Sequence, residues 1–243
     1  MKSRRTAVFS DVHGNLPALE AVLQDMKTQE VTDYFCLGDI VGYGAEPAEC
    51  LEKVRALKCP VLKGNHDAAV TGESIMPLHS AAQQAVEYTK KLLSSEQKEY
   101  LRGLPLVHCG KRFHAVHASF HEPPDWYYVM DVVDAAMCFY CERAPLLFCG
   151  HTHVPAIWES KNICRFLRPK SPFNLDKNSR YLVNPGSVGQ PRDGDPRASY
   201  LIYESPANRL FFRRVAYDID RAQRTILKAG LPERLAERLE EGG

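Results

Sequence analysis

The fold is decided by the stretch TAVFSDVHGNLPALEAVL, which spans residues 6–23. Its start, Thr6 to Ser10, is an apolar run that predicts a buried β-strand. Asn15 can cap a helix, a proline suits that helix's first turn, and leucine and valine then recur at helical spacing. Asp11 and His13 therefore lie at the end of a strand, where the chain turns into a helix.

Four further segments place histidine, aspartate or asparagine after a short apolar run. They are Gly38-Asp39, Gly64-Asn65-His66-Asp67, His117 and Gly150-His151-Thr152-His153. Because strand ends in a layered α/β fold meet at one edge, we expect these side chains to lie close together. Each motif alone is more typical of a turn or a surface loop, so it is the ordered series that indicates a site.

Together these segments offer the oxygen and nitrogen donors of a site for two metal ions. The candidate ligands are Asp11, His13, Asp39, Asn65, His117, His151 and His153. This mixture suits divalent or trivalent transition metals (Mn, Fe, Zn, Ni or Co) better than calcium or magnesium. Two such cations side by side are well suited to the in-line hydrolysis of a phosphate ester.

The rest of the chain predicts an α/β protein with one domain over residues 1–243. Helices are expected over 47–57, 80–93, 95–102 and 131–143. Strands are expected over 34–37, 60–62 and 146–149, and a strand hairpin over 104–109 and 112–118. Short strands over 154–158, 163–167, 181–183, 199–203 and 209–215 predict a second, mostly antiparallel sheet. Two helices are expected from residue 218 to about residue 240. Their leucines at positions 227, 231, 235 and 239 suit either a cover for the sheet or a homodimer interface.

Composition gives no support for several classes of protein. The net charge of +1 gives no basis for a nucleic-acid or membrane-surface protein, and no apolar stretch approaches the ~20 residues that span a bilayer. Cys36, Cys109 and Cys149 lie in apolar runs, which predicts small buried side chains. Cys138 and Cys141 lack the second pair that a structural zinc site needs. Eight reduced cysteines favour a cytoplasmic location.

The ordered series D-V-H, G-D, G-N-H-D, V-H and G-H-T-H resembles the calcineurin-like metallophosphoesterase superfamily. The segments GDIVGYG (residues 38–44) and NPGSVGQPR (residues 184–192) resemble its small bacterial phosphodiesterase branch. The resemblance covers roughly residues 6–203. It implies a four-layer α-β-β-α sandwich of two mixed β-sheets flanked by helices, with a dinuclear metal site at one edge.

The resemblance also implies a role for each motif residue. Asp11, His13 and His153 resemble the ligands of the first metal. Asn65, His117 and His151 resemble those of the second, and Asp39 resembles the ligand that bridges both. His66 resembles the catalytic residue that faces the leaving-group oxygen without binding metal.

The chain departs from the phosphatase branches of the family at two places. Their second motif reads G-D-x-x-D-R-G, whereas Gly42-Tyr43 stands here in place of the Asp-Arg pair. Their third motif ends in glutamate, whereas this one ends in Asp67. Both differences weigh against a phosphoprotein substrate and favour a small phosphodiester or nucleotide. They leave open which residues orient His66.

The predicted activity is hydrolysis of a small phosphate ester by a metal-bridging hydroxide, with His66 donating a proton or hydrogen bond to the leaving group. Arg192 and Arg197 are candidate phosphate contacts, and the alternative is that they pair with the aspartates of their own loop. Tyr43 and the aromatics of residues 126–128 suit either substrate contact or core packing. The remaining histidines, His79, His108, His114 and His121, belong to no motif and are read as structural.

Two other functions remain open at this point. One is a nuclease acting on single-stranded nucleic acid, for which the basic residues between 165 and 180 would form the contact surface. The other is a non-catalytic scaffold that binds metal, which the full set of candidate ligands together with His66 disfavours.

Overall fold

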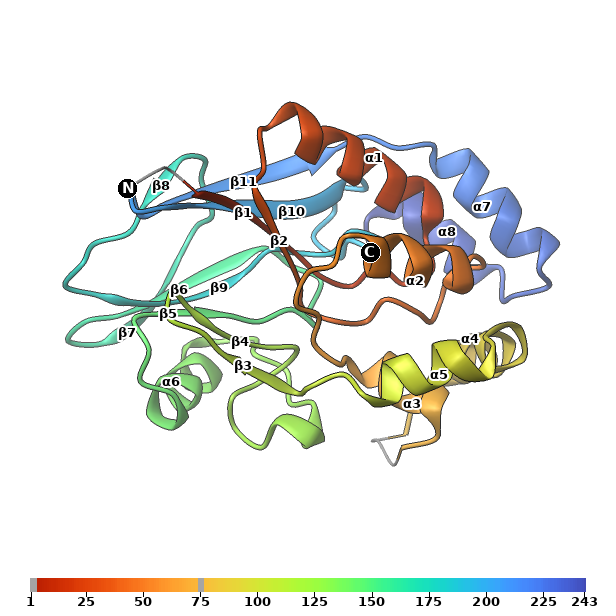
Figure 1. The fold of residues 1–243 in the computed structure, drawn as a ribbon, viewed down its shortest axis with the longest axis horizontal. Coiled ribbons are helices and arrows are strands. Elements are labelled where there is room, and N and C mark those ends of the chain that lie inside the picture. The colour runs from red at the N-terminus through yellow and green to blue at the C-terminus, as the bar shows by residue number, and fades with distance from the viewer. Residues whose placement is uncertain (1–3, 74–76) are drawn as a thin grey trace.

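Two mixed β-sheets pack face to face, and helices cover their outer faces (Figure 1). The computed structural model describes residues 4–73 and 77–243. Side chains from both sheets, such as Val8 and Leu201 on one and Phe148 and Val183 on the other, form the core between them. Helix α1 (Leu16–Thr28) covers the first sheet and α6 (Val132–Cys141) covers the second. The predicted four-layer sandwich is therefore confirmed.

The first sheet contains strands from both the N-terminal and the C-terminal parts of the chain. Its strand order is β2 (Asp33–Cys36), β1 (Arg4–Phe9), β10 (Ala198–Ser205), β11 (Arg209–Val215) and β8 (Phe173–Asn174). Strands β1 and β2 are parallel, and helix α1 connects them. Strand β10 pairs antiparallel with β1 and places Leu201 opposite Val8.

The second sheet is built around the strands that carry the later histidines. Its order is β3 (Val107–Cys109), β4 (His114–Val116), β5 (Leu146–Phe148), β9 (Arg180–Asn184), β6 (Ala156–Ser160) and β7 (Cys164–Leu167). The prediction of a separate sheet made only of the later strands was wrong. The later strands divide between the two sheets, because both β1 and β5 have an open edge that needs a partner.

The predicted strand at Pro60–Leu62 is reduced to one parallel bridge, between Val61 and Cys36. Helix α3 (Asn65–Thr71), which the sequence analysis did not predict, begins directly after it. The predicted helices at α2 (Pro47–Ala56), α4 (Ser80–Leu92) and α5 (Ser95–Arg102) are confirmed. A single 3-10 turn, Pro123–Asp125, interrupts the segment that precedes α6.

The tail forms helices α7 (Ile219–Lys228) and α8 (Arg234–Glu241), as predicted. Leu231, Leu235 and Leu239 are buried in a cluster with Tyr43, whereas Leu227 is 49% exposed. The tail helices therefore cover the loop that carries Tyr43, and a homodimer stays a prediction. Within residues 4–73 and 77–243, no helix combines the length and the apolar character needed to cross a bilayer.

The cysteines divide by location. All eight are free, and Cys36 and Cys149 are buried as predicted. The prediction for Cys109 was wrong, because β3 is an edge strand that ends at a hairpin turn and its last residue is exposed. Cys138 is buried and Cys141 is exposed, so the C-x-x-C pair does not share one environment.

Candidate metal centre

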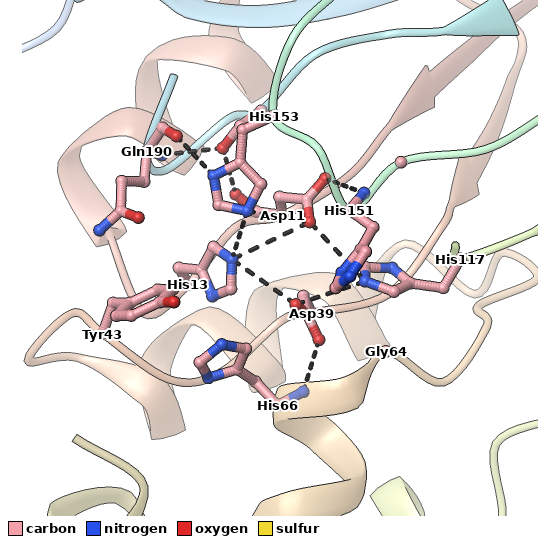
Figure 2. A network of polar contacts seen from close by, with 12 residues as sticks. Asp11, His13, Asp39, Tyr43, Gly64, His66, His117, His151, His153 and Gln190 are labelled. Atoms are coloured by element: carbon pink, nitrogen blue, oxygen red, sulfur yellow. Dashed lines mark hydrogen bonds and ion pairs between the residues drawn. The ribbon is translucent and has the colours of Figure 1, made fainter. Parts of the chain in front are cut away.

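The loops that follow β1, β2, β4 and β5 meet above α3 and bring the motif side chains together (Figure 2). Five of the candidate ligands adopt left-handed backbone conformations. Their φ angles are 56° at Asp11, 49° at His13, 52° at Asp39, 67° at His151 and 63° at His153. Non-glycine residues rarely adopt positive φ, and such residues gather at functional sites where the surrounding structure holds them.

Backbone hydrogen bonds hold these loops to one another. The Asp11 N–H donates to the Gly38 carbonyl at 3.0 Å, and the His13 N–H donates to the Asp39 carbonyl at 3.0 Å. The Gly150 N–H donates to the His117 carbonyl at 2.7 Å. These bonds hold the loops together and fix the unusual backbone conformations of the candidate ligands.

Asp39 occupies the middle of the cluster. Its Oδ2 lies 3.6 Å from His13 Nε2 and 3.4 Å from His117 Nε2, while its Oδ1 accepts the His66 N–H at 2.8 Å. A Cβ atom on Gly64 would fall 2.0 Å from the Asp39 carboxylate, so only glycine fits there. This position between two histidines is the one expected of a carboxylate shared by two metals.

Three of the histidines are oriented by backbone carbonyl groups. The Nδ1 atoms of His13, His117 and His153 lie 3.1, 3.0 and 2.6 Å from the carbonyl oxygens of Val41, Leu37 and Gln190. A carbonyl can only accept a hydrogen bond, so each Nδ1 carries a proton and each Nε2 faces the centre, where the lone pair of the neutral imidazole can bind a metal ion. This arrangement is characteristic of histidine ligands to metals.

The donor atoms fit metal ions. His13 Nε2 and His153 Nε2 lie 3.0 Å apart, and with both Nδ1 atoms donating elsewhere their lone pairs face each other. A cation between them would remove that repulsion. Four buried atoms in the cluster have no hydrogen-bond partner among the described residues. These are Asp11 Oδ1, Asn65 Oδ1, His117 Nε2 and His151 Nε2.

The donors form two neighbouring groups, Asp11 with His13 and His153, and Asp39 with His117 and His151. Within each group the donor atoms lie within 4.8 Å of one another. Asn65 is buried at the start of α3, beside His66. Six of the seven predicted ligands thus meet at one edge of the sheets, and a third group, His13 with Asp39 and His66, overlaps both of these groups.

The charges in the cluster depend on one another. Burial raises the pKa of Asp39, but His117 and His66 outweigh it and hold that pKa well below its ordinary value. Burial lowers the pKa of His117, but Asp39 outweighs it and the result is a pKa of about 9. Burial and the charge of His117 lower the pKa of His151 to about 3. Protonated His117 therefore balances the buried carboxylates, which is a role that bound cations would take over.

His66 is oriented by the residues that replace the Asp-Arg pair. Its ring lies 4.4 Å from the Tyr43 ring and 4.9 Å from the His13 ring, centroid to centroid. A Cβ atom on Gly42 would fall 2.4 Å from His66 Nδ1, so the imidazole packs directly on the Gly42 backbone. Gly42 and Tyr43 therefore both contact the His66 ring and fix its position.

Replacing Gly42 with alanine is expected to lower phosphodiester hydrolysis by roughly tenfold to a hundredfold, because the new methyl group displaces His66. Metal content should be unchanged. The matched control is Gly230→Ala, since Gly230 also has a positive φ (70°) but nothing within 4 Å of its Cβ position. Equal losses in the two variants would show that backbone strain alone, and not contact with His66, explains the effect.

The two arginines lie in different environments. Arg192 is half-buried, its Cζ lies 5.7 Å from the centre of the Tyr43 ring, and its Nη2 donates to Gln190 at 2.8 Å. Arg197 is exposed and forms a two-pronged ion pair with Asp195, at 2.9 and 2.6 Å. None of the contacts among the described residues links Arg197 to the cluster, so only Arg192 is placed near the candidate site.

The aromatic segment before α6 borders the centre. Trp126 is buried and its ring lies 5.9 Å from the His117 ring. Tyr128 is 50% exposed and stacks on His151 at 4.1 Å. Trp126 therefore packs inside the protein. Tyr128 covers His151 with one face of its ring and exposes the other face to solvent.

Several further residues position the centre, although no role at the centre was predicted for them above. Asp67 accepts hydrogen bonds from the N–H groups of Gly64, Asp39, Ile40 and Val41 at 2.8–3.3 Å, so it joins two of the loops. The Asn184 side chain donates to the Gly150 carbonyl at 2.7 Å, and the Ser187 hydroxyl donates to the Asp11 carbonyl at 2.8 Å. Asp67, Asn184 and Ser187 all lie inside the sequence motifs quoted above, so the motifs did mark these positions.

The chain is similar to one family model and to several known proteins. A model described as the calcineurin-like phosphoesterase superfamily domain matches residues 5–207. An uncharacterized protein of Methanocaldococcus jannaschii is 42% identical over 239 residues, which is 96% of each chain. A crystal structure of a metallophosphoesterase from Sphaerobacter thermophilus has a TM-score of 0.87 and 40% identity, with full coverage of both chains.

A more distant relative has a named activity. The symmetrical bis(5'-nucleosyl)-tetraphosphatase of Coxiella burnetii is 28% identical over 127 residues. The match covers 51% of this chain and 44% of that protein, so it is confined to about half of each.

Proposed function

Because this chain belongs to the calcineurin-like metallophosphoesterase superfamily, whose members are phosphoester hydrolases, we propose that it hydrolyses a small phosphodiester or nucleotide at a dinuclear metal centre. The observation that carries the proposal is the pair of donor groups on either side of Asp39, with histidine Nε2 atoms facing inward. Asp11, His13 and His153 would hold one ion, Asn65, His117 and His151 the other, and Asp39 would contact both.

When bound, two transition metal ions supply a water nucleophile at neutral pH and offset the negative charge of the phosphate. The chain itself supplies the geometry and the proton donor. Burial and the charges of His153 and Arg192 lower the pKa of His66 to about 4, although Asp39 opposes this. A neutral His66 keeps one N–H, which can donate a hydrogen bond to the departing oxygen. The negative charge of a bound phosphate favours full protonation.

The surroundings of the centre support a small substrate. Gly42 and Tyr43 replace the charged pair of the phosphatase motif, and Tyr43 is buried against His13 and His66. Arg192, next to Tyr43, would contact a phosphate oxygen, and Tyr128, stacked on His151, would offer its exposed aromatic face to a nucleobase. The partial similarity to a dinucleoside tetraphosphatase adds nucleotides to the candidate substrates.

Arg192→Gln is expected to raise KM for a phosphodiester roughly tenfold with little change in metal content, because one charged hydrogen bond to phosphate is lost. Arg197→Gln is the matched control, since that arginine pairs with Asp195 in the same loop and should leave KM unchanged. Steady-state kinetics of both variants measure the difference. Equal effects of both substitutions would exclude a specific phosphate contact by Arg192.

The proposal is tested by metal analysis combined with a substrate panel. The panel contains an aryl phosphodiester, a phosphomonoester, cyclic nucleotides, dinucleoside polyphosphates and single-stranded DNA, each assayed with manganese present. Preferred hydrolysis of a small diester or nucleotide supports the proposal, whereas preferred cleavage of DNA, weakened by salt, favours the nuclease. Full metal occupancy with no hydrolysis of any substrate favours the scaffold.

The structure offers little support for the nuclease. Arg165 forms an ion pair with Glu159 at 2.5 Å. Arg180 donates to the carbonyl of Phe139 at 3.1 Å and packs over the ring of the same residue. Two of the five basic residues between 165 and 180 are thus already paired within the chain.

A further inference from the structure

A second cluster of metal-binding side chains lies at the opposite end of β4 from the candidate metal centre. Cys109 ends β3 and His114 begins β4, and the two residues are directly paired across this antiparallel hairpin. The turn between them is closed by the Gly110 N–H, which donates to the Phe113 carbonyl at 3.2 Å. A directly opposed pair places its two side chains on one face of the hairpin, about 5 Å apart at Cβ.

The third member of the cluster comes from the end of α6. Glu142 follows the last residue of this helix, and its Oε1 accepts the N–H groups of Arg143 and Ala144 at 2.6 and 3.0 Å. These bonds leave Oε2 directed at the hairpin, where it lies 2.9 Å from His114 Nδ1. That nitrogen is buried, and Glu142 is its close polar partner among the described residues. The carboxylate is therefore held in place before any ligand arrives.

The three donor atoms suit one ion. The Cys109 sulfur, a His114 nitrogen and a Glu142 oxygen all lie within 4.8 Å of one another. The edges of a tetrahedral zinc site measure about 3.3–3.8 Å, so small side-chain rotations bring the three donors onto one cation. A thiolate together with an imidazole selects zinc, cobalt and similar ions, and disfavours calcium and magnesium.

We propose that Cys109, His114 and Glu142 form a third metal site, specific for a zinc-class divalent cation and separate from the candidate metal centre. As the ion binds, the thiol loses its proton to solvent and the sulfur–metal bond forms. Cys109 is exposed, so a water molecule completes the coordination. The distance from His114 to His117 is three residues along one strand, or about 10 Å, too far for a shared ligand. The site would fasten the end of α6 to the hairpin.

Cobalt titration of the chelator-treated protein tests the proposal. A thiolate bound to cobalt produces a charge-transfer absorption in the near ultraviolet, and the candidate metal centre contains only oxygen and nitrogen donors. The signal therefore reports on the third site even if the proposed hydrolysis is wrong. We expect the absorption in the wild-type protein and in Cys141→Ser, whose thiol is also exposed, and its loss in Cys109→Ser. Glu142→Gln should weaken cobalt binding at least roughly tenfold.

A second measurement uses the unmodified chain. Zinc should slow alkylation of Cys109 by iodoacetamide and leave alkylation of Cys141 unchanged, as read by peptide mass mapping. Absence of the charge-transfer absorption in the wild-type protein would overturn the proposal. Its persistence in Cys109→Ser would do so as well, and so would equal alkylation of Cys109 with and without zinc.

Discussion

Replacing Asp39 with alanine is expected to remove bound metal and to lower phosphodiester hydrolysis at least about a thousandfold. Asp39 is the carboxylate that lies between the two donor groups, 3.6 Å from His13 Nε2 and 3.4 Å from His117 Nε2. Under the proposed two-metal arrangement, its removal would take a ligand from both ions at once, whereas loss of Asp11 or His151 would take a ligand from one. Elemental analysis after reconstitution with excess manganese measures the metal, and an aryl phosphodiester measures the rate.

Asp39→Asn removes the negative charge of the side chain and keeps its shape, so it tests the effect of the charge alone. The amide keeps an oxygen that can accept the His66 N–H, which Asp39 Oδ1 accepts at 2.8 Å, but it lacks the negative charge that a shared ligand needs. His117 and His66 hold the pKa of Asp39 well below its ordinary value despite burial, so the charge of Asp39 stabilises the folded, metal-free protein. We therefore expect Asp39→Asn to lower the free energy of unfolding of the metal-free protein as well as to lose metal. Retention of two ions per chain in Asp39→Asn would exclude Asp39 as the shared ligand.

Much of this site could be predicted because its information is local in sequence. Each strand end carries its own donor residues, and parallel strands necessarily bring their ends to one edge. The predicted positions of Asp11, Asp39, His117 and His151 needed only that rule. The five positive φ angles could not be predicted, because bonds between loops impose them, such as the one from Asp11 N–H to the Gly38 carbonyl.

The assignment of strands to sheets could not be predicted because it is not local. Alternating apolar residues identify a strand and say nothing about its neighbour. Strand β10 is buried along almost its whole length because it lies between β1 and β11, although nearly 190 residues separate β1 from β10. The exposure of Cys109 has the same origin, since an apolar run predicts burial and cannot show that its strand lies at an edge.

The question of what orients His66 required the structure. The missing Asp-Arg pair left open which residues orient His66, and the structure shows a different support at the same positions. Gly42 leaves room for the imidazole, and Tyr43 packs against it at 4.4 Å. A larger residue at position 42 and this position of His66 exclude each other, so Gly42 and His66 form one functional unit.

His66→Ala is expected to lower the turnover of an alkyl phosphodiester about a hundredfold to ten-thousandfold, the range that general acid catalysis contributes, with no loss of metal. His66 meets Asp39 through its backbone N–H, and alanine keeps that bond. The loss should be much smaller for a diester with a good aryloxide leaving group, because that oxygen needs no proton to depart. His66→Gln keeps side-chain volume and a hydrogen-bond donor but cannot transfer a proton, so it should retain more activity than alanine if hydrogen bonding alone suffices. An equal loss on both substrates, at unchanged metal content, would mean that His66 positions the phosphate and does not assist the leaving group.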